Sequence, residues 1–406
     1  MKRILITVIL CFAGMTVFAQ NMSYYTNDYM RPDGSYAERL RVLETVRDSG
    51  TTGIGEFYHD ALKFLLARVP DIRGRTEQDA AEKSAIILCQ GLGAEKYTAA
   101  AGDIWQVAVQ FDVVRDANEG NTMQAALIAL GQVNGTDFLP QIVQRLNDYN
   151  TQTYRNPETR RRVQMAVIGC INALEAMHDA SGFRPVFFAS VGSYDPAVMQ
   201  IASNALPNIV EDPGEIISAI IQDPSNDPRV KLMAWTEMLR TKAPNSSKAR
   251  VAAIALTTGW TYSTPNRVLQ ENLRDMRKSA IDTIRQFGVT DNSVYTNLER
   301  SYTSNFNSSQ PDYDEIMFTL NALAAISSEE AVDLLNKFLR ELHGRRRNGP
   351  WGDKERIVFQ WVIPCIGVTG TKSEDSRLLL TTIQRTSDYT PYEQGLAREA
   401  LEKLGF

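Results

Sequence analysis

The sequence predicts an all-α fold in which helical hairpins stack side by side into a right-handed α-α superhelix. Apolar residues recur at the i, i+3, i+4, i+7 spacing of one helical face through most of the 406 residues. Turn-forming residues separate these stretches in pairs, and no segment alternates as a long strand would. We therefore expect about eight or nine helical hairpins over residues 37–406.

The clearest hairpin spans Asn121–Tyr149. The apolar stripe of its first helix is Met123, Ala126, Leu127 and Leu130, and that of its second helix is Leu139, Ile142, Val143, Leu146 and Tyr149. Two glycines and an asparagine between Gly131 and Thr136 suit a helix end and a tight turn. Neither helix can bury its stripe alone, so the hairpin needs neighbours of the same kind.

The remaining helix pairs follow from Ala37 onward almost without interruption. They are 40–46 with 54–69, 77–92 with 97–114, 158–177 with 183–191, 196–210 with 214–221, 228–239 with 247–256, 265–287 with 294–302, 314–326 with 329–343, and 354–368 with 374–386. A single helix at 391–404 ends the series. Two polar loops, 301–311 and 344–353, interrupt it.

Six of the expected helix starts carry the same signal, a capping side chain followed by proline. The pairs are Asn156-Pro157, Asp195-Pro196, Asp212-Pro213, Asp227-Pro228, Thr264-Pro265 and Thr390-Pro391. The capping oxygen accepts a free backbone N–H, and proline at the first helical position gives up an N–H that had no partner. Ser327 with Glu330 and Thr390 with Glu393 also have the capping-box spacing. This repeated signal indicates a repeated unit.

Three stretches resemble the first helix of a HEAT repeat. They are YDPAVMQIASNAL from Tyr194, NDPRVKLMAWTEML from Asn226 and EQGLAREALEKLG from Glu393. The resemblance implies a single HEAT/armadillo-like solenoid over residues 37–406. It also implies a concave face formed by the second helix of each pair, and recognition of protein or peptide partners on an extended surface.

Residues 1–19 have the pattern of a secretory signal peptide. Lys2 and Arg3 precede an apolar run over residues 4–18, and cleavage is expected after Ala19. The run is shorter than the ~20 residues that span a bilayer, so we expect a periplasmic or secreted protein without a transmembrane segment. A buried N-terminal helix, a membrane anchor and lipidation at Cys11 are the alternatives. Residues 20–36, rich in tyrosine, are expected to form an N-terminal arm over the first helix or an aromatic ligand-contact surface.

Composition excludes several classes of function. The net charge is −5, and removal of a segment containing Lys2 and Arg3 makes it more negative, which argues against nucleic-acid binding. The cysteines left after such cleavage, Cys89, Cys170 and Cys365, are scattered through apolar helices and predict buried side chains rather than a disulfide framework.

The sequence offers little catalytic or metal-binding chemistry. The three histidines, His59, His178 and His343, do not form an HExxH motif or the His-Glu pairs of the HEAT-type deoxyhypusine hydroxylases. We expect them at the surface or at helix ends. Phosphate-binding and dinucleotide-binding glycine motifs are also absent from the sequence. We therefore expect no cofactor, no metal and no enzymatic activity.

One basic cluster stands out as a candidate binding site. Arg345, Arg346 and Arg347 lie beside Trp351 in the loop at 344–353. Arginine and tryptophan are enriched at interface hot spots, which favours a docking site for an acidic partner or an anionic envelope surface. The alternative is a set of solvated cations that interact with the C-terminal dipole of a helix. A second cluster, Arg160–Arg162, begins a helix and splays around it.

The sequence as a whole favours an exported interaction scaffold of the bacterial envelope, with a protein or peptide partner and possible peripheral envelope contact. An accessory or catalytic protein that acts on cell-wall or carbohydrate material in the solenoid groove is the alternative. A deep pocket with neighbouring carboxylates of perturbed pKa would favour that alternative. A self-assembling envelope component is a third hypothesis, which concentration-dependent oligomers would reveal.

Overall fold

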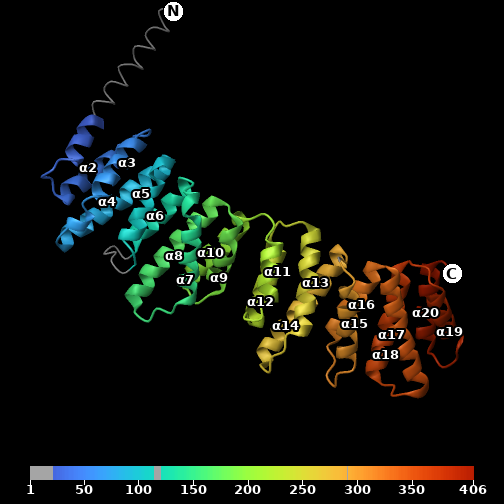
Figure 1. The fold of residues 1–406 in the computed structure, drawn as a ribbon. Coiled ribbons are helices and arrows are strands. Elements are labelled where there is room, and N and C mark those ends of the chain that lie inside the picture. Colours follow the sequence, from blue (N-terminus) through green and yellow to red (C-terminus); the bar gives the residue numbers. More distant parts are fainter. Residues whose placement is uncertain (1–21, 114–119, 290) are drawn as a thin grey trace, which may run out of the picture. The chain divides into compact units, whose positions relative to one another are not determined.

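The chain is helical almost throughout in the computed structural model, which describes residues 22–113, 120–289 and 291–406 (Figure 1). The signal peptide expected at residues 1–19 lies outside the described residues. Contacts divide the chain into two compact units, Met1–Glu211 and Asp212–Phe406. Each unit consists of two layers of helices, and strands are absent from the described ranges.

The first unit contains the helices up to α10. They are α2 (Tyr36–Asp48), α3 (Gly55–Leu66), α4 (Arg75–Ala94), α5 (Ala101–Gln110), α6 (Asn121–Gln132), α7 (Leu139–Thr151), α8 (Pro157–Met177), α9 (Phe183–Val191) and α10 (Pro196–Ile209). Helices α2, α4, α6, α8 and α10 pack one after another. Helices α3, α5, α7 and α9 pack against them as a second layer.

The second unit repeats this arrangement. Its helices are α11 (Gly214–Gln222), α12 (Pro228–Arg240), α13 (Asn245–Thr261), α14 (Arg267–Phe287), α15 (Ser293–Phe306), α16 (Tyr313–Ile326), α17 (Glu329–Asn348), α18 (Asp353–Thr369), α19 (Glu374–Arg385) and α20 (Pro391–Leu404). The even-numbered helices form one row and the odd-numbered helices the other. We call these the first-helix layer and the second-helix layer. Paired helices in two layers confirm the predicted all-α, HEAT-like stacking.

The first-helix layer packs closely because small residues face one another. A Cβ atom on Gly131 of α6 would lie 2.8 Å from the Cα atom of Ala173 on α8, and one on Gly367 of α18 would lie 2.8 Å from the Cα atom of Ala400 on α20. The helix end predicted between Gly131 and Thr136 is confirmed, because α6 ends at Gln132. Gly131 lies inside α6, where the approach of α8 leaves no room for a side chain.

The capping signals located four of the six expected helix starts. Asn156, Asp195, Asp227 and Thr390 are N-caps, and Thr390 forms the expected capping box with Glu393. Helix α11 begins one residue later than the Asp212-Pro213 signal predicts, at Gly214, and Pro213 is its N-cap. Helix α14 begins at Arg267 instead of Pro265, because the Asn266 side chain accepts from two backbone N–H groups.

Ser327 does not start a helix, contrary to the capping-box prediction. It ends α16 in the left-handed region with φ 56°, and Ser328 is the residue that caps α17. Helix α15 extends to Phe306, so the loop expected at 301–311 is half helical. Burial explains the extension, since Tyr302 is fully buried and stacks on Phe338 with ring centroids 3.7 Å apart.

Residues 22–29, within the expected N-terminal arm, form a short helix. Tyr29 is fully buried and meets Phe64 of α3 edge to face, with centroids 5.9 Å apart. The Arg39 guanidinium on α2 donates to the carbonyl oxygen of Tyr29 at 3.0 Å. These contacts fix the segment to the first hairpin.

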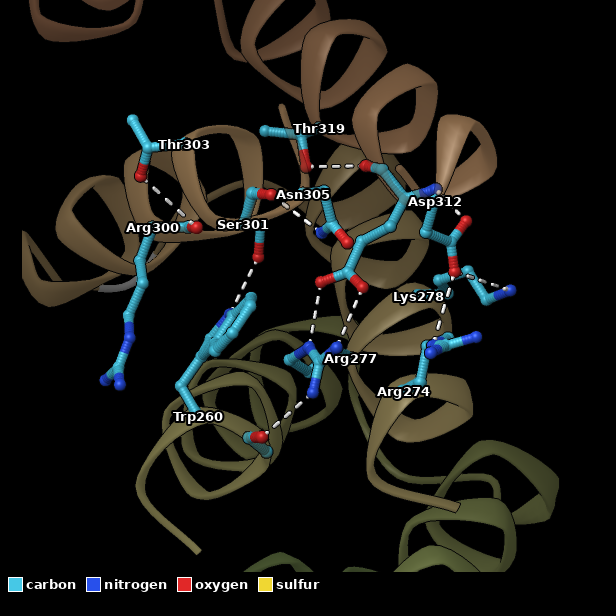
Figure 2. A network of polar contacts seen from close by, with 12 residues as sticks. Trp260, Arg274, Arg277, Lys278, Arg300, Ser301, Thr303, Asn305, Asp312 and Thr319 are labelled. Atoms are coloured by element: carbon cyan, nitrogen blue, oxygen red, sulfur yellow. Dashed lines mark hydrogen bonds and ion pairs between the residues drawn. The ribbon is translucent and has the colours of Figure 1, made fainter. Parts of the chain in front are cut away.

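Buried polar contacts join neighbouring hairpins of the second unit. The guanidinium of Arg277 on α14 donates two hydrogen bonds to the carboxylate of Glu315 on α16, at 2.8 and 2.9 Å. Its third nitrogen donates to the carbonyl oxygen of Gly259 on α13. Figure 2 labels Arg277 and draws these contacts as dashed lines. Glu315 is fully buried. The Arg277 guanidinium also lies 4.0 Å from the ring centroid of Trp260, whose indole N–H donates to Ser301 on α15. This network connects four successive helices.

Lys231 on α12 closes the end of α11. Its side chain is almost fully buried, and its ammonium donates to the carbonyl oxygens of Ile221 and Asp223. These carbonyls lie at the end of α11, where the helix itself leaves them without N–H partners. The lysine therefore acts as a C-terminal cap supplied by the next helix.

The three cysteines within the described ranges are free and buried, as expected. Across those same ranges, no helix combines the length and apolar character that a membrane crossing would require.

Candidate binding surfaces

The predicted arginine cluster lies on a helix rather than in a loop. Helix α17 continues to Asn348 and so includes Arg345, Arg346 and Arg347. Cations are favoured in the last turn of a helix, and two of these arginines also have partners within the fold. The loop predicted at 344–353 is therefore restricted to the short connection between α17 and α18.

Arg345 is held by side chains on three elements. Its guanidinium donates to Glu341 at 2.8 Å and to Asn307 at 2.9 Å, and it lies 3.6 Å from the carboxylate of Glu355. It also lies 4.7 Å from the ring centroid of Phe306, within the range of a cation–π contact. Its charge is therefore used to fix α17 against α15 and α18.

Arg346 joins α17 to the last helix. Its guanidinium pairs with the fully buried Glu393 of α20 at 3.1 Å and also donates to the carbonyl oxygen of Asp388. It lies between two rings, 4.8 Å from the centroid of Trp351 and 4.7 Å from that of Tyr389. Trp351 meets Phe359 edge to face. Arg346 and Trp351 thus belong to an intramolecular cluster.

Arg347 has a different environment, because it is exposed. It lies near His343, whose ring stacks on Tyr389 and whose Nδ1 forms a hydrogen bond with the Tyr389 hydroxyl. Burial lowers the pKa of His343 and the positive charge of Arg347 lowers it further, while Asp388 opposes the shift. Of the four predicted residues, three have contacts inside the fold and Arg347 extends into solvent.

A groove of about 620 Å³ lies between α4 and α6 of the first unit. We call it the α4–α6 groove. Its lining residues are Lys83, Ile86, Gln90, Ala94, Asn121, Gln124, Ala125, Ile128 and Gln132. Amide and small aliphatic side chains dominate this set. The groove therefore offers several hydrogen-bonding side chains and almost no charge.

Close approach of the two helices forms the bottom of this groove. A Cβ atom on Gly93 would overlap the side-chain amide oxygen of Gln132 and would come within 3.3 Å of the Cα atom of Ala129. The absence of a side chain at Gly93 is what allows the Gln132 side chain to lie across α4. Gly93 belongs to α4 itself rather than to the turn after it.

A second groove, of about 540 Å³, crosses α14, α16 and α18 of the second unit. We call it the α14–α18 groove. Its lining residues are Asp282, Arg285, Phe318, Asn321, Ala324, Ala325, Pro364, Cys365 and Val368. Val368 is 60% exposed although it is apolar. Pro364 lies inside α18 and cannot donate the helical hydrogen bond to the carbonyl of Gln360. This groove is more apolar than the α4–α6 groove.

Both grooves belong to the first-helix layer, whereas the sequence placed the binding face on the second helix of each pair. In the second unit, charged side chains of the second-helix layer pair with one another from helix to helix. The pairs are Arg250 with Glu215, Lys337 with Glu299, and Arg340 with Asp375. Asn297 on α15 adds a hydrogen bond to Thr257 on α13 at 2.9 Å. These groups already have partners within the chain.

The histidines are placed differently from one another. His178 ends α8 in the left-handed region, as a helix-end histidine would. The expectation of a surface position was wrong for His59, which is 7% exposed and hydrogen-bonds through Nε2 to Asp103 on α5 at 2.8 Å. Its ring also lies against Tyr97. The described residues contain no group of three or more His, Cys, Asp or Glu side chains arranged to hold a metal ion.

Sequence reasoning missed the groove residues. Gln90, Gln124 and Gln132 have the spacing of an ordinary solvated helix face, and nothing in one sequence distinguishes them from other exposed amides. Gly93, Ala125 and Ala129 could have indicated that α4 and α6 lie close together, since small residues on two neighbouring helices permit a close approach.

No family model matches the sequence, and none of the curated proteins matches it. Two similar solved structures are of importin beta, one in an ammonium sulfate condition and one in a polyethylene glycol condition. Their sequence identities are 10% and 9%, and their TM-scores are 0.35 and 0.30.

The two matches cover 96% and 95% of this chain. They cover 53% and 59% of the importin beta chains, so this chain spans little more than half their length. The packing of first and second helices in successive pairs defines a HEAT-like α-solenoid.

Proposed function

We propose that the protein is an interaction scaffold that binds a protein or peptide partner on its first-helix layer. The observation that carries this proposal is the position of the two grooves, which lie between successive first helices and are lined by amide, small and apolar side chains. Repeat proteins use such continuous surfaces, built from several units, for recognition.

The choice of layer rests on the ion pairs between helices of the second-helix layer and on the exposed apolar side chains of the α14–α18 groove. A binding surface needs groups whose contacts are completed by the partner. Interhelical pairs occupy Arg250, Lys337 and Arg340 of the second-helix layer. In the α14–α18 groove, by contrast, Phe318 is half-exposed and Val368 is exposed.

The carbohydrate-processing alternative finds less support. Neighbouring carboxylates of perturbed pKa would favour it. The lining of the α4–α6 groove contains no carboxylate, and that of the α14–α18 groove contains one, Asp282, which accepts from Arg285 and Gln286. We therefore propose a non-enzymatic role.

Only one residue of the arginine cluster, Arg347, is proposed to contact a partner. Arg345 and Arg346 have contacts within the fold, so their replacement disturbs the structure as well as any interface. Arg347→Ser removes an exposed cation and affects the fold only through its charge near His343. We propose Arg347 as a peripheral contact for an acidic partner, and unchanged partner binding in this variant would exclude it.

Site-specific photocrosslinking tests the scaffold proposal. A photoreactive amino acid is placed at Ala94 in one groove, at Ala325 in the other, and at Thr382 on α19 as an exposed control in the second-helix layer. Irradiation in the native host should yield a discrete crosslinked protein from a groove position and none from Thr382. Equal crosslinking at all three positions would contradict the proposed face.

We also propose that the scaffold is exported to the periplasm or beyond. The basic start, the apolar run and Val17-Phe18-Ala19 support this location. N-terminal sequencing of the protein purified from its host should begin at Gln20. An intact Met1 in the purified protein would argue against export by this route.

A further inference from the structure

The α4–α6 groove has almost no charge. Lys83 is the one ionisable residue of its lining, and its ammonium is already 2.7 Å from the carboxylate of Asp79. A strongly charged ligand would therefore find no unpaired opposite charge among these lining side chains. The groove suits a ligand that is neutral over the length in contact.

The same groove is rich in hydrogen-bonding groups. Gln90 on α4 and Gln132 on α6 are exposed, and Gln124 on α6 is half-buried. Within the parts of the chain that the structure describes, these three amides have no hydrogen-bond partner. Each amide offers two donor hydrogens and an acceptor oxygen. A ligand with alternating donors and acceptors matches them, and a peptide main chain is such a ligand.

The length of the groove fits a short extended peptide. Its walls run from Lys83 to Ala94 on α4 and from Asn121 to Gln132 on α6. At a rise of ~1.5 Å per residue each wall is about 16 Å long. An extended chain advances ~3.3 Å per residue, so about five residues lie along the groove.

Apolar contacts in the groove are aliphatic. Ile86 on α4 and Ile128 on α6 are half-buried and line opposite walls. The lining contains no aromatic ring that could stack on a sugar. Small aliphatic side chains of a peptide would pack against the two isoleucines while its main chain reaches the amides.

From these observations we propose that the α4–α6 groove binds an extended, uncharged polypeptide segment of about five residues through its main chain. Gln90, Gln124 and Gln132 pair with peptide N–H and C=O groups, and Ile86 and Ile128 contact small aliphatic side chains. This inference rests on the proposed scaffold function and specifies what one of its two grooves recognises.

Methyl NMR of the full-length protein tests the inference. The Ile δ1 methyl groups are labelled, and Ile86 and Ile128 serve as reporters. The probe is an equimolar mixture of end-capped pentapeptides built from Ala, Val, Leu, Ser and Thr. The matched control is the same mixture with alternate peptide nitrogens methylated, which removes main-chain donors and keeps the side chains.

We expect saturable shifts of the Ile86 and Ile128 signals with the unmodified mixture, and at least tenfold weaker binding of the methylated mixture. Gln90→Ala with Gln132→Ala should also weaken binding at least tenfold, because one neutral hydrogen bond changes affinity roughly fivefold. The matched variant is Gln200→Ala with Asn204→Ala on α10, where the two exposed amides bond to each other. It should bind as the unaltered protein does.

Three results would overturn the inference: no shift at either isoleucine, equal binding of the methylated mixture, or unchanged binding by the Gln90/Gln132 variant. Circular dichroism of each variant verifies that the fold is retained. The scaffold function fails on a different result, the absence of any crosslinked protein from Ala94 and Ala325. A crosslink at Ala325 with no peptide binding at Ile86 and Ile128 would remove the inference and leave the scaffold function intact.

Discussion

Three consecutive arginines near the end of α17 have three different environments. Arg345 lies against Phe306 and Glu341, Arg346 reaches the buried Glu393 on α20, and Arg347 extends into solvent. The helical rotation of 100° per residue separates them, so neighbours in sequence face different helices. The effect of a substitution in this run should therefore depend strongly on its position.

Arg346→Ala should destabilise the protein by about 3 kcal/mol, because it leaves the Glu393 carboxylate buried without its guanidinium. Urea unfolding followed by circular dichroism measures this loss. Arg347→Ala is the matched control and should change the free energy of unfolding by less than about 0.5 kcal/mol, as exposed substitutions usually do. Equal effects of the two substitutions would contradict the assigned environments.

The His343–Tyr389 contact predicts a pH dependence of stability. Burial first, and the charge of Arg347 second, hold the pKa of His343 below its ordinary value of 6.5 in the folded protein. Burial also raises the pKa of Tyr389 to about 12, so its hydroxyl stays protonated at neutral pH. Below pH 6.5 the unfolded state binds more protons at this histidine than the folded state. Stability should therefore fall as the pH drops from 7 towards the folded pKa.

NMR titration of the His343 ring should give a pKa below 6.5, and Arg347→Ala should raise that pKa by removing one of its causes. His343→Gln should flatten the dependence of the unfolding free energy on pH between 7 and 5. A pKa above 6.5 in the unaltered protein would contradict the burial argument.

At the scale of the helices, small residues set the distance between neighbours in the first-helix layer. Gly131 and Gly169 lie on the facing sides of α6 and α8, where each added Cβ would meet the other helix within about 3 Å. Close backbone approach gives many weak contacts at once, which together stabilise the pair. The packing of this layer therefore requires glycine at these positions, although glycine has a low helix propensity.

Gly131→Val should destabilise the first unit by about 1–3 kcal/mol, the usual cost of adding groups to a closely packed contact. Gly102→Ala on α5 is the matched control, because nothing lies within 4 Å of its added Cβ. That change should be neutral or stabilising by up to about 1 kcal/mol, since alanine favours helix more than glycine does. Thermal unfolding of both variants provides the comparison.

The helices themselves could be predicted because each apolar stripe is a local pattern. Where a predicted helix start was wrong, a nearby residue caps the helix instead. Asn266 is the N-cap of α14, although the sequence predicted a start at Thr264-Pro265. The contacts of the arginine cluster could not be predicted, because Glu393 lies 47 residues from Arg346, on the last helix of the chain. The groove amides gave no signal for a related reason. Their significance comes from a second helix that packs beside them.

At the scale of the molecule, contacts divide the chain at Glu211–Asp212 into two compact units. In repeat proteins each hairpin interacts chiefly with its neighbours, so stability is the sum of local terms. A perturbation within one unit should consequently have little effect on the core of the other.

Tryptophan fluorescence can test this independence. Trp105 belongs to the first unit, and the other four tryptophans of the sequence, Trp235, Trp260, Trp351 and Trp361, belong to the second. In a Trp105→Phe background, fluorescence reports the second unit while far-UV circular dichroism reports both. Gly131→Val should lower the midpoint of part of the circular dichroism transition and leave the fluorescence midpoint unchanged. An equal shift of both signals would show that the units unfold together.

The burial of Lys231 has a consequence for chemical labelling. Its amine is occupied by two carbonyl groups and shielded from solvent, whereas Lys83 and Lys337 are exposed. Amine-reactive reagents should modify those two lysines while the fold is intact and reach Lys231 only when the corner between α11 and α12 opens. The rate at which Lys231 is modified thus measures the rate at which that corner opens, without an introduced probe.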